Sequence, residues 1–192
     1  MQSDGPHTSA LLIVDIQNDY FPGGKMELEG SDAASQRAGE LLAAFRERRR
    51  PVIHVQHVSL RPGATFFLPD TDGVRIHARV APLDHETVIR KHFPNSFRET
   101  ALLEHLRGAG IEELVIAGMM THMCVDATTR AAADLGFRCS LAQDACATRA
   151  LAFGDTQIPA AHVQGSFLAA LSGTYAIVKP ARDLAAGLTA GH

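Results

Sequence analysis

Three residues with reactive side chains follow short apolar runs in the sequence. Asp15 comes after LLIV, Lys91 comes after TVIR, and Cys124 comes a few residues after LVIAG. A thiol supplies a nucleophile, a carboxylate moves protons, and an ammonium keeps its partners charged. Together these side chains suit acyl transfer from an amide carbon, provided that the fold brings them to one place.

Cys124 stands where the sequence predicts the start of a helix, over 124–136. Free N–H groups and the positive end of the helix dipole lie at such a position. A nearby Lys91 ammonium adds to their effect, so we expect a lowered thiol pKa. Asp15 would accept the thiol proton and later deliver it to a leaving amine. The Cys124 N–H, with a second N–H from the preceding turn, would bind an oxyanion.

Each of these residues also has an ordinary structural interpretation. A free cysteine commonly fills a core as a small hydrophobe, and we expect this of Cys139 and Cys146. Asp15 taken alone could be a turn or capping carboxylate, and Lys91 taken alone a solvated charge. Their joint placement at strand ends favours the functional interpretation.

The elements that must position these side chains alternate between strands and helices. We predict strands over 11–15, 52–58, 87–90, 114–117, 137–142 and 175–178, and helices over 31–50, 97–110, 124–136 and 157–172. A segment rich in proline, glycine and aspartate, 60–82, is typical of a long loop. The alternation predicts an α/β fold with a mostly parallel sheet covered by helices on both faces. Ligands of such sheets bind beyond the carboxyl ends of the strands, where all three reactive side chains fall.

Composition narrows the class of protein. The chain has 192 residues, of which 46% are hydrophobic and 20% charged, with a net charge of −3. These values predict one domain over 1–192, with flexible tails at 1–9 and 183–192, and exclude global disorder, collagen and coiled coil. No basic surplus points to nucleic acid, and no apolar run is long enough for a membrane span. Three cysteines without a secretion signal predict reduced thiols and a cytoplasmic location.

Four segments together resemble the isochorismatase-like cysteine hydrolases. They are VDIQNDY at 14–20 followed by FPGG, IRKHFPNSF at 89–97, AGMMTHMCVDATTRAAADLGF at 117–137 and DACATR at 144–149. They occur in the family's order and cover nearly the whole chain. The resemblance implies a three-layer α/β/α fold with a six-stranded parallel sheet of isochorismatase-like, Rossmann-like topology.

The resemblance also implies roles for individual residues. Asp15, Lys91 and Cys124 match the catalytic triad of the family. A cis peptide bond is implied between Met119 and Met120, and the N–H groups of Met120 and Cys124 are implied as the oxyanion hole. The implied reaction is hydrolysis of a C–N bond in a small amide, ureido or cyclic amide through a thioester. Relatives are often dimers or higher oligomers, so we expect a homo-oligomer.

Other functions stay open at this point. True isochorismatases of the family cleave a vinyl ether and lack the nucleophilic cysteine, so Cys124 favours the amidohydrolase branch. A non-catalytic binding protein of the same fold would not need a complete triad. A nucleotide-binding module is disfavoured, because no G-x-G-x-x-G follows the first predicted strand and no Walker lysine motif occurs.

Substrate contacts are expected from aromatic and sulfur-containing side chains. Tyr20, Phe66 and Met123 are the candidates, and Phe66 with Phe67 in the long loop could form a lid over the pocket. The alternative is that these residues belong to the core or to an interface. An apolar pocket would suit a small, fairly apolar amide.

We expect neither a metal nor a cofactor. Nicotinamidases among the relatives bind a metal through Asp and His near the second strand, where this chain has His54 and His57. Positions three apart in a strand face opposite sides, so we expect both histidines to pack or hydrogen-bond instead. His92 and His122 lie near the predicted site, and contact with substrate and a supporting or solvent-exposed role are both open for them.

Overall fold

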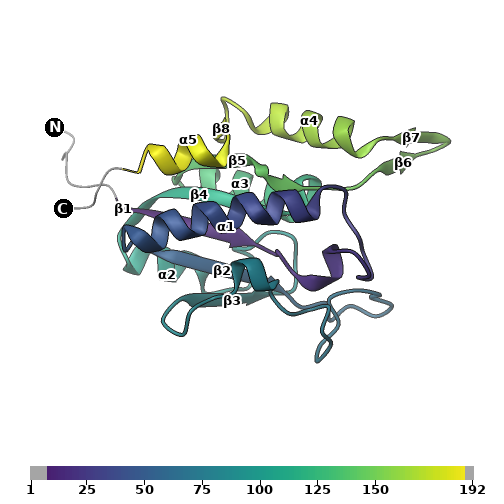
Figure 1. The fold of residues 1–192 in the computed structure, drawn as a ribbon, viewed down its shortest axis with the longest axis horizontal. Helices are drawn as coiled ribbons and strands as arrows, with labels where there is room; N and C mark the ends of the chain where they lie inside the picture. Colours follow the sequence, from purple (N-terminus) through teal and green to yellow (C-terminus); the bar gives the residue numbers. More distant parts are fainter. Residues whose placement is uncertain (1–7, 189–192) are drawn as a thin grey trace.

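The computed structural model describes residues 8–188. At its centre lies a sheet in the order β3-β2-β1-β4-β5-β8, in which all neighbouring strands run parallel (Figure 1). The six strands are β1 (Thr8–Val14), β2 (Val52–His57), β3 (Thr87–Lys91), β4 (Ile111–Met119), β5 (Arg138–Ala147) and β8 (Ile177–Lys179). The expected six-stranded parallel sheet is confirmed.

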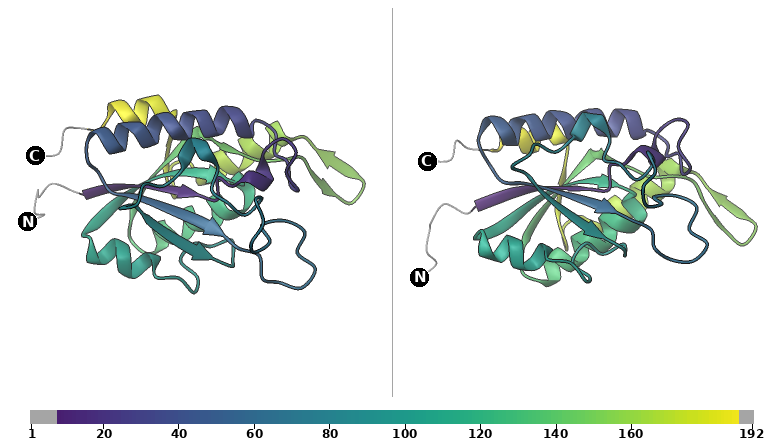
Figure 2. Two further views of the ribbon diagram at one scale, coloured as in Figure 1. Left: turned by 60° about the horizontal axis from the view of Figure 1, so that its bottom comes forward. Right: turned by 90° about the horizontal axis from the view of Figure 1, so that it is seen from below.

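Helices cover both faces of this sheet, so that the described chain forms three layers (Figure 2). They are α1 (Ser31–Glu47) and α5 (Ala181–Ala186) on one face, and α2 (Leu102–Gly108), α3 (Asp126–Asp134) and α4 (Ala160–Leu171) on the other. Leu11 and Ile13 of β1 pack into the core below α1, while Leu12 and Val14 pack into the opposite core. Alternate strand residues point to opposite faces, so an uninterrupted apolar run is buried on both.

A short antiparallel hairpin of β6 (Leu151–Phe153) and β7 (Thr156–Ile158) extends from the body beside α4 (Figure 1). The sequence predicted a helix from 157 onward, but α4 begins only at Ala160. Pro159 occupies the N-cap position with an extended backbone, ψ 147°. Because a proline disfavours helical geometry in the residue before it, Ile158 ends a strand and the helix starts later.

Two other predicted helices differ from the observed ones. Within the helix predicted over 97–110, only Leu102–Gly108 is helical, as α2. The residues before it form a turn, in which the Thr100 hydroxyl donates to the Ser96 carbonyl at 2.6 Å. Side-chain bonds of this kind compete with helical ones. The helix predicted over 124–136 is divided into a π-helical turn, η3 (Thr121–Val125), and α3. Cys124 therefore lies in the π-helical turn and not at the start of the α-helix.

The tails expected at 1–9 and 183–192 fall mostly on residues 1–7 and 189–192, outside the described residues. Where they overlap the described range, residues 8–9 belong to β1, and residues 183–186 belong to α5. Ala181 is buried, and Leu184 and Ala185 pack against the core beside α1, so apolar burial orders this segment. Among residues 8–188, no helix has the length and apolar character needed to cross a bilayer.

Candidate active site

Three strand ends bring Asp15, Lys91 and Cys124 together. Asp15 directly follows β1, Lys91 is the last residue of β3, and Cys124 lies in η3 after β4. Since β1 adjoins β4, and only β2 separates it from β3, all three side chains reach the same end of the sheet. The Nζ of Lys91 donates to Oδ2 of Asp15 at 2.5 Å, and neither side chain is exposed. The Cys124 sulfur lies within 4.8 Å of a carboxylate oxygen of Asp15.

Burial and charge together shift the pKa values of this cluster. Burial by itself lowers the pKa of Lys91, but the Asp15 carboxylate, together with Cys124 beside it, outweighs burial and raises that pKa. Burial raises the pKa of the Cys124 thiol, Asp15 raises it further, and Lys91 opposes them only in part. The lowered thiol pKa expected from the sequence is therefore wrong. In the resting site the thiol keeps its proton, because desolvation and a carboxylate outweigh one ammonium.

Asp15 has one carboxylate oxygen without a partner. Oδ2 binds Lys91, whereas Oδ1 is buried with no hydrogen-bond partner among the described residues. The backbone of Asp15 has a φ of 52°, in the left-handed region that few non-glycine residues adopt. Such conformations cluster at functional sites, where the surrounding structure maintains them. A buried, unpartnered carboxylate oxygen beside a protonated thiol is well placed to accept the thiol proton.

A cavity of about 260 Å³ adjoins Cys124. Tyr20, Phe66 and Met123, the three residues expected to contact substrate, all line it, and so does Met120. Tyr20 is buried and packs edge-on against the Phe67 ring, with 4.6 Å between the ring centroids. Burial raises the pKa of Tyr20 well above its ordinary value, and its neighbours Cys124 and Asp15 add to this effect. The hydroxyl of Tyr20 therefore stays neutral. The peptide bond between Met119 and Met120 is cis, as the resemblance implied.

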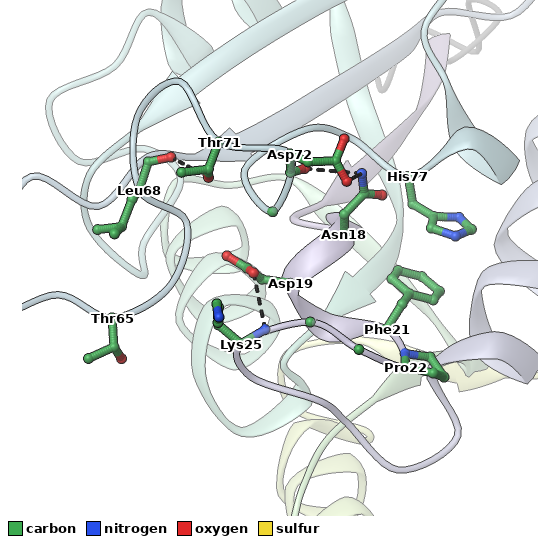
Figure 3. Close-up of a pocket in the computed structure, with 13 residues that line it drawn as sticks. Asn18, Asp19, Phe21, Pro22, Lys25, Thr65, Leu68, Thr71, Asp72 and His77 are labelled. Carbon is green, nitrogen blue, oxygen red and sulfur yellow. Dashed lines mark hydrogen bonds between the residues drawn. The ribbon is translucent and has the colours of Figure 1, made fainter.

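One wall of the cavity is held by Asp19, a buried carboxylate that sequence reasoning missed. Its Oδ2 accepts the Phe67 N–H at 2.6 Å. Its Oδ1 accepts the Lys25 N–H at 3.1 Å, as Figure 3 shows. The bond to Phe67 holds the long loop where it carries Phe66 and Phe67 into the cavity wall, and the bond to Lys25 holds Asp19 to the segment after Tyr20. Asp19 also borders a larger cavity of about 620 Å³, to which Thr65 of the same loop contributes. The available signal was the place of Asp19 within the VDIQNDY motif.

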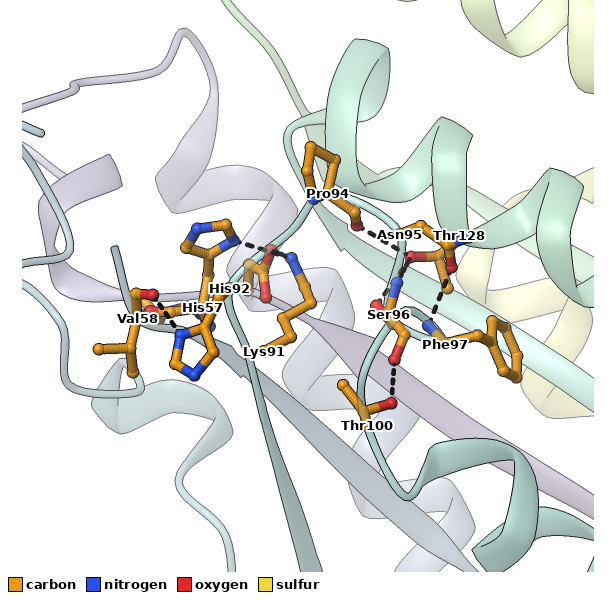
Figure 4. A network of polar contacts seen from close by, with 12 residues as sticks. His57, Val58, Lys91, His92, Pro94, Asn95, Ser96, Phe97, Thr100 and Thr128 are labelled. Carbon is orange, nitrogen blue, oxygen red and sulfur yellow. Dashed lines mark hydrogen bonds and ion pairs between the residues drawn. The ribbon is translucent and has the colours of Figure 1, made fainter. Parts of the chain in front are cut away.

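A second network connects the strand of Lys91 to the helix that follows Cys124 (Figure 4). The N–H and hydroxyl of Ser96, after β3, lie 3.1 and 2.7 Å from Oγ1 of Thr128 in α3. These bonds fix the position of Lys91 relative to Cys124. Sequence reasoning missed both residues. Ser96 lies within the segment 89–97 and Thr128 within 117–137, but neither segment by itself shows that the two hydroxyls meet.

His54 and His57 lie in the same strand, but their rings contact different residues. His54 is buried, and its Nε2 lies 2.9 Å from Oε2 of Glu86, which confirms the expected hydrogen bonding. The Nδ1 of His57 lies 3.1 Å from the Lys91 Nζ, and the ring lines the cavity (Figure 4). Burial, and then the charge of Lys91, lower the pKa of His57 to about 4, so this ring is neutral near pH 7. Its place inside the cluster was not foreseen.

The other two histidines near the site also have fixed partners. The Nδ1 of His92 lies 2.8 Å from the Val58 carbonyl oxygen, and the side chain lines the cavity. The Nδ1 of His122 lies 2.5 Å from the Thr148 hydroxyl, and His122 is not part of that cavity wall.

Asp15, His57 and Cys124 bring three potential metal ligands together. Their ligand atoms lie within 4.8 Å of one another, and such a set can bind a transition metal. However, the Lys91 ammonium contacts both Asp15 and His57, so a cation would have to displace a buried positive charge. The residues present fit an ammonium at this point better than a metal ion.

The fold and the site define a parallel α/β protein in which a thiol, a carboxylate and an ammonium meet beside a small cavity. The sequence model of the isochorismatase domain matches residues 9–170. The uncharacterized isochorismatase family protein YddQ of Bacillus subtilis is 53% identical over 172 residues, which cover 90% of this chain and 96% of YddQ. The chain therefore belongs to the isochorismatase family of hydrolases.

Two further comparisons describe its place in that family. An isochorismatase hydrolase from Oleispira antarctica, known from a crystal structure, has 48% sequence identity and a TM-score of 0.92, covering 97% of this chain and 100% of that one. The streptothricin hydrolase of Streptomyces noursei is 38% identical over 139 residues, which cover 72% of this chain but 49% of that hydrolase.

Proposed function

We propose that this protein is a cysteine-dependent hydrolase that cleaves a C–N bond of a small amide, ureido compound or cyclic amide through a thioester. The observation that carries the proposal is the arrangement around Asp15. One oxygen is bound by Lys91, the other is buried and unpartnered, and the Cys124 sulfur lies within 4.8 Å of a carboxylate oxygen of Asp15. This arrangement provides a nucleophile together with the base that activates it.

The first half of the reaction forms the thioester. The Cys124 thiol transfers its proton to Asp15 as its sulfur attacks the amide carbon. The N–H groups of Met120 and Cys124, residues that both line the cavity, bind the oxyanion. Asp15 then protonates the leaving nitrogen, and the C–N bond breaks to release an amine or ammonia.

The second half hydrolyses the thioester. Asp15, again a carboxylate, takes a proton from water while the water oxygen attacks the thioester carbon. The C–S bond breaks, and the proton on Asp15 returns to the Cys124 sulfur. Lys91 stabilises the charged form of Asp15 during both halves, since an ammonium at 2.5 Å offsets the desolvation of the carboxylate.

The cavity supports a small substrate with some apolar surface. Its volume of about 260 Å³ is slightly below the usual range for pockets that bind drug-sized ligands, and its wall includes Tyr20, Phe66 and Met123. The name of the streptothricin hydrolase describes hydrolysis, which agrees with this class of reaction. The expected homo-oligomer and the cytoplasmic location stay predictions.

Intact-protein mass spectrometry with a panel of amides, ureides and lactams, run together with an ammonia assay, tests the proposal. We expect substrate-dependent ammonia from the amides and an acyl adduct that maps to Cys124. Cys124→Ala should lower turnover by at least about 10³-fold, because it removes the nucleophile.

Cys139→Ala is the matched control, because Cys139 is a free, buried thiol that does not line the cavity. This variant should keep wild-type turnover once it is folded. Near-normal turnover in Cys124→Ala would refute the cysteine mechanism.

A further inference from the structure

His57 is a side chain at the centre of the site that the proposed mechanism does not use. It is the last residue of β2, the strand between the ends that carry Asp15 and Lys91. The amide of Gln17 holds its backbone from both sides: Oε1 accepts the His57 N–H at 2.8 Å, and Nε2 donates to the His57 carbonyl at 2.9 Å. The imidazole therefore projects from a fixed point of the backbone.

The contact with Lys91 determines which ring nitrogen of His57 carries the hydrogen. The Lys91 Nζ lies 3.1 Å from Nδ1 of His57. An ammonium has three hydrogens to donate and no lone pair to accept one, so Nδ1 must be the acceptor and must carry no hydrogen. A neutral imidazole with a bare Nδ1 carries its hydrogen on Nε2.

The ring of His57 lines the cavity beside Cys124. Within residues 8–188, its Nε2–H donates to no other group. This donor is accessible rather than buried, so a ligand in the mainly apolar cavity can bind it through an acceptor atom. The cavity wall includes the guanidinium-bearing Arg61 and no carboxylate side chain of its own. Its polar groups therefore favour a ligand that carries hydrogen-bond acceptors.

His92 shows that this donor is specific to one histidine of the wall. The Nδ1 of His92 faces the Val58 carbonyl oxygen at 2.8 Å, so this nitrogen is the donor. A neutral His92 therefore presents a bare Nε2, the opposite tautomer to that of His57.

We propose that His57, fixed as its Nε2–H tautomer by Lys91, donates a hydrogen bond to an acceptor atom of the substrate and so selects amides or ureides with a second acceptor beside the scissile carbonyl. This inference rests on the proposed function, because the substrate must be bound next to Cys124. His57 is a specificity-determining residue and takes no part in proton transfer.

Nuclear magnetic resonance of the full chain labelled with ¹⁵N in histidine tests the tautomer without any substrate. We expect the His57 ring near pH 7 to show a hydrogen on Nε2 and a bare Nδ1. Replacing Lys91 by Met should release this preference. A His57 ring with its hydrogen on Nδ1, or a doubly protonated ring, would overturn the inference.

Alkylation of Cys124 tests the donor in the cavity. Iodoacetamide carries a carbonyl acceptor, whereas 1-iodopropane has a similar size and none, so the ratio of their rates cancels any change in the thiol itself. His57→Leu should lower this ratio by about 3–10-fold, the effect of one lost hydrogen bond. His57→Gln keeps an acceptor for Lys91 and a donor for the cavity, and should stay within about twofold of the wild type.

The outcomes separate this inference from the proposed function. An unchanged ratio in a folded His57→Leu variant would refute the donor role, even if Cys124 is the nucleophile. If Cys124→Ala still hydrolyses amides while the ratio falls in His57→Leu, the cysteine mechanism fails and the donor stands. A Cys124 that reacts with neither reagent would refute both, because the cavity would then not admit a small molecule to the thiol.

Discussion

Asp15 and Lys91 can be buried as charges only because they are buried together. Desolvating a single ion costs several kcal/mol, and only a close partner offsets that cost. The 2.5 Å contact between Oδ2 of Asp15 and Nζ of Lys91 provides this partner. The same attraction raises the pKa of Lys91, because the carboxylate favours the charged form of the amine. The buried Lys91 ammonium therefore depends on Asp15 for its charge.

Replacing Lys91 by Met leaves the Asp15 carboxylate buried without its partner. We expect this variant to lose about 3–5 kcal/mol of unfolding free energy at neutral pH, measured by urea unfolding as a lower midpoint at an unchanged slope. The double variant Asp15→Asn/Lys91→Met is the matched control and should recover most of the loss, since no charge remains buried. A Lys91→Met protein as stable as the wild type would contradict the pairing.

Among the elements, β1 and β4 approach each other closely where the site begins. Gly118, near the end of β4, has a φ of 151°, and a Cβ at this position would lie 2.1 Å from the Val14 carbonyl oxygen. Only glycine allows so close an approach of two backbones. The turn that contains Met120 and Cys124 therefore starts directly beside the end of β1, next to Asp15.

Gly118→Ala should reduce the unfolding free energy by about 2–5 kcal/mol, because it combines backbone strain with a clash against main-chain atoms. Gly165→Ala is a suitable control: Gly165 lies in α4, and a Cβ there meets nothing within 4 Å. The control should gain about 0.5–1 kcal/mol from helix propensity. Thermal or urea unfolding measures the stability of both variants. Equal stabilities of Gly118→Ala and Gly165→Ala would argue against the close approach of the β1 and β4 backbones.

For the molecule as a whole, three buried thiols make the unfolding free energy decrease at alkaline pH. Burial raises the pKa of Cys139 and of Cys146 to about 12, and it also raises that of Cys124. The folded chain therefore keeps thiol protons that the unfolded chain releases above about pH 8.5. The stability that the protonated thiols contribute is complete below that pH. It is lost as the pH rises toward the thiol pKa values of the folded chain.

We expect the unfolding free energy to fall between pH 8 and pH 10, with a slope of up to about 1.4 kcal/mol per pH unit for each buried thiol. Urea unfolding across this range, with a reducing agent present, measures the slope. Cys139→Ala removes one of the three titrating thiols, so its slope should be shallower than that of the wild type. A stability that is flat or rising over this range would disprove the coupling.

The sequence by itself determined the parallel sheet and the three reactive positions, because both follow from local patterns. A run such as LLIV is apolar at every position, which suits a strand buried on both faces, and the carboxyl ends of parallel strands share one edge. Asp15, Lys91 and Cys124 could thus be assigned to one crevice without coordinates. The hairpin β6–β7 was missed because its two short strands pair only with each other and stand outside the strand–helix alternation that identified the other strands.

Only the tertiary structure decided the protonation states of the site and the contacts that fix its side chains. The local position of Cys124 predicted a lowered thiol pKa, but burial and the Asp15 carboxylate raise it. The tautomer of His57 depends on Lys91, and the wall formed by Phe67 depends on Asp19. These contacts join segments that are distant in the chain. Desolvation and hydrogen bonding arise from such long-range contacts, and no local pattern of residues encodes them.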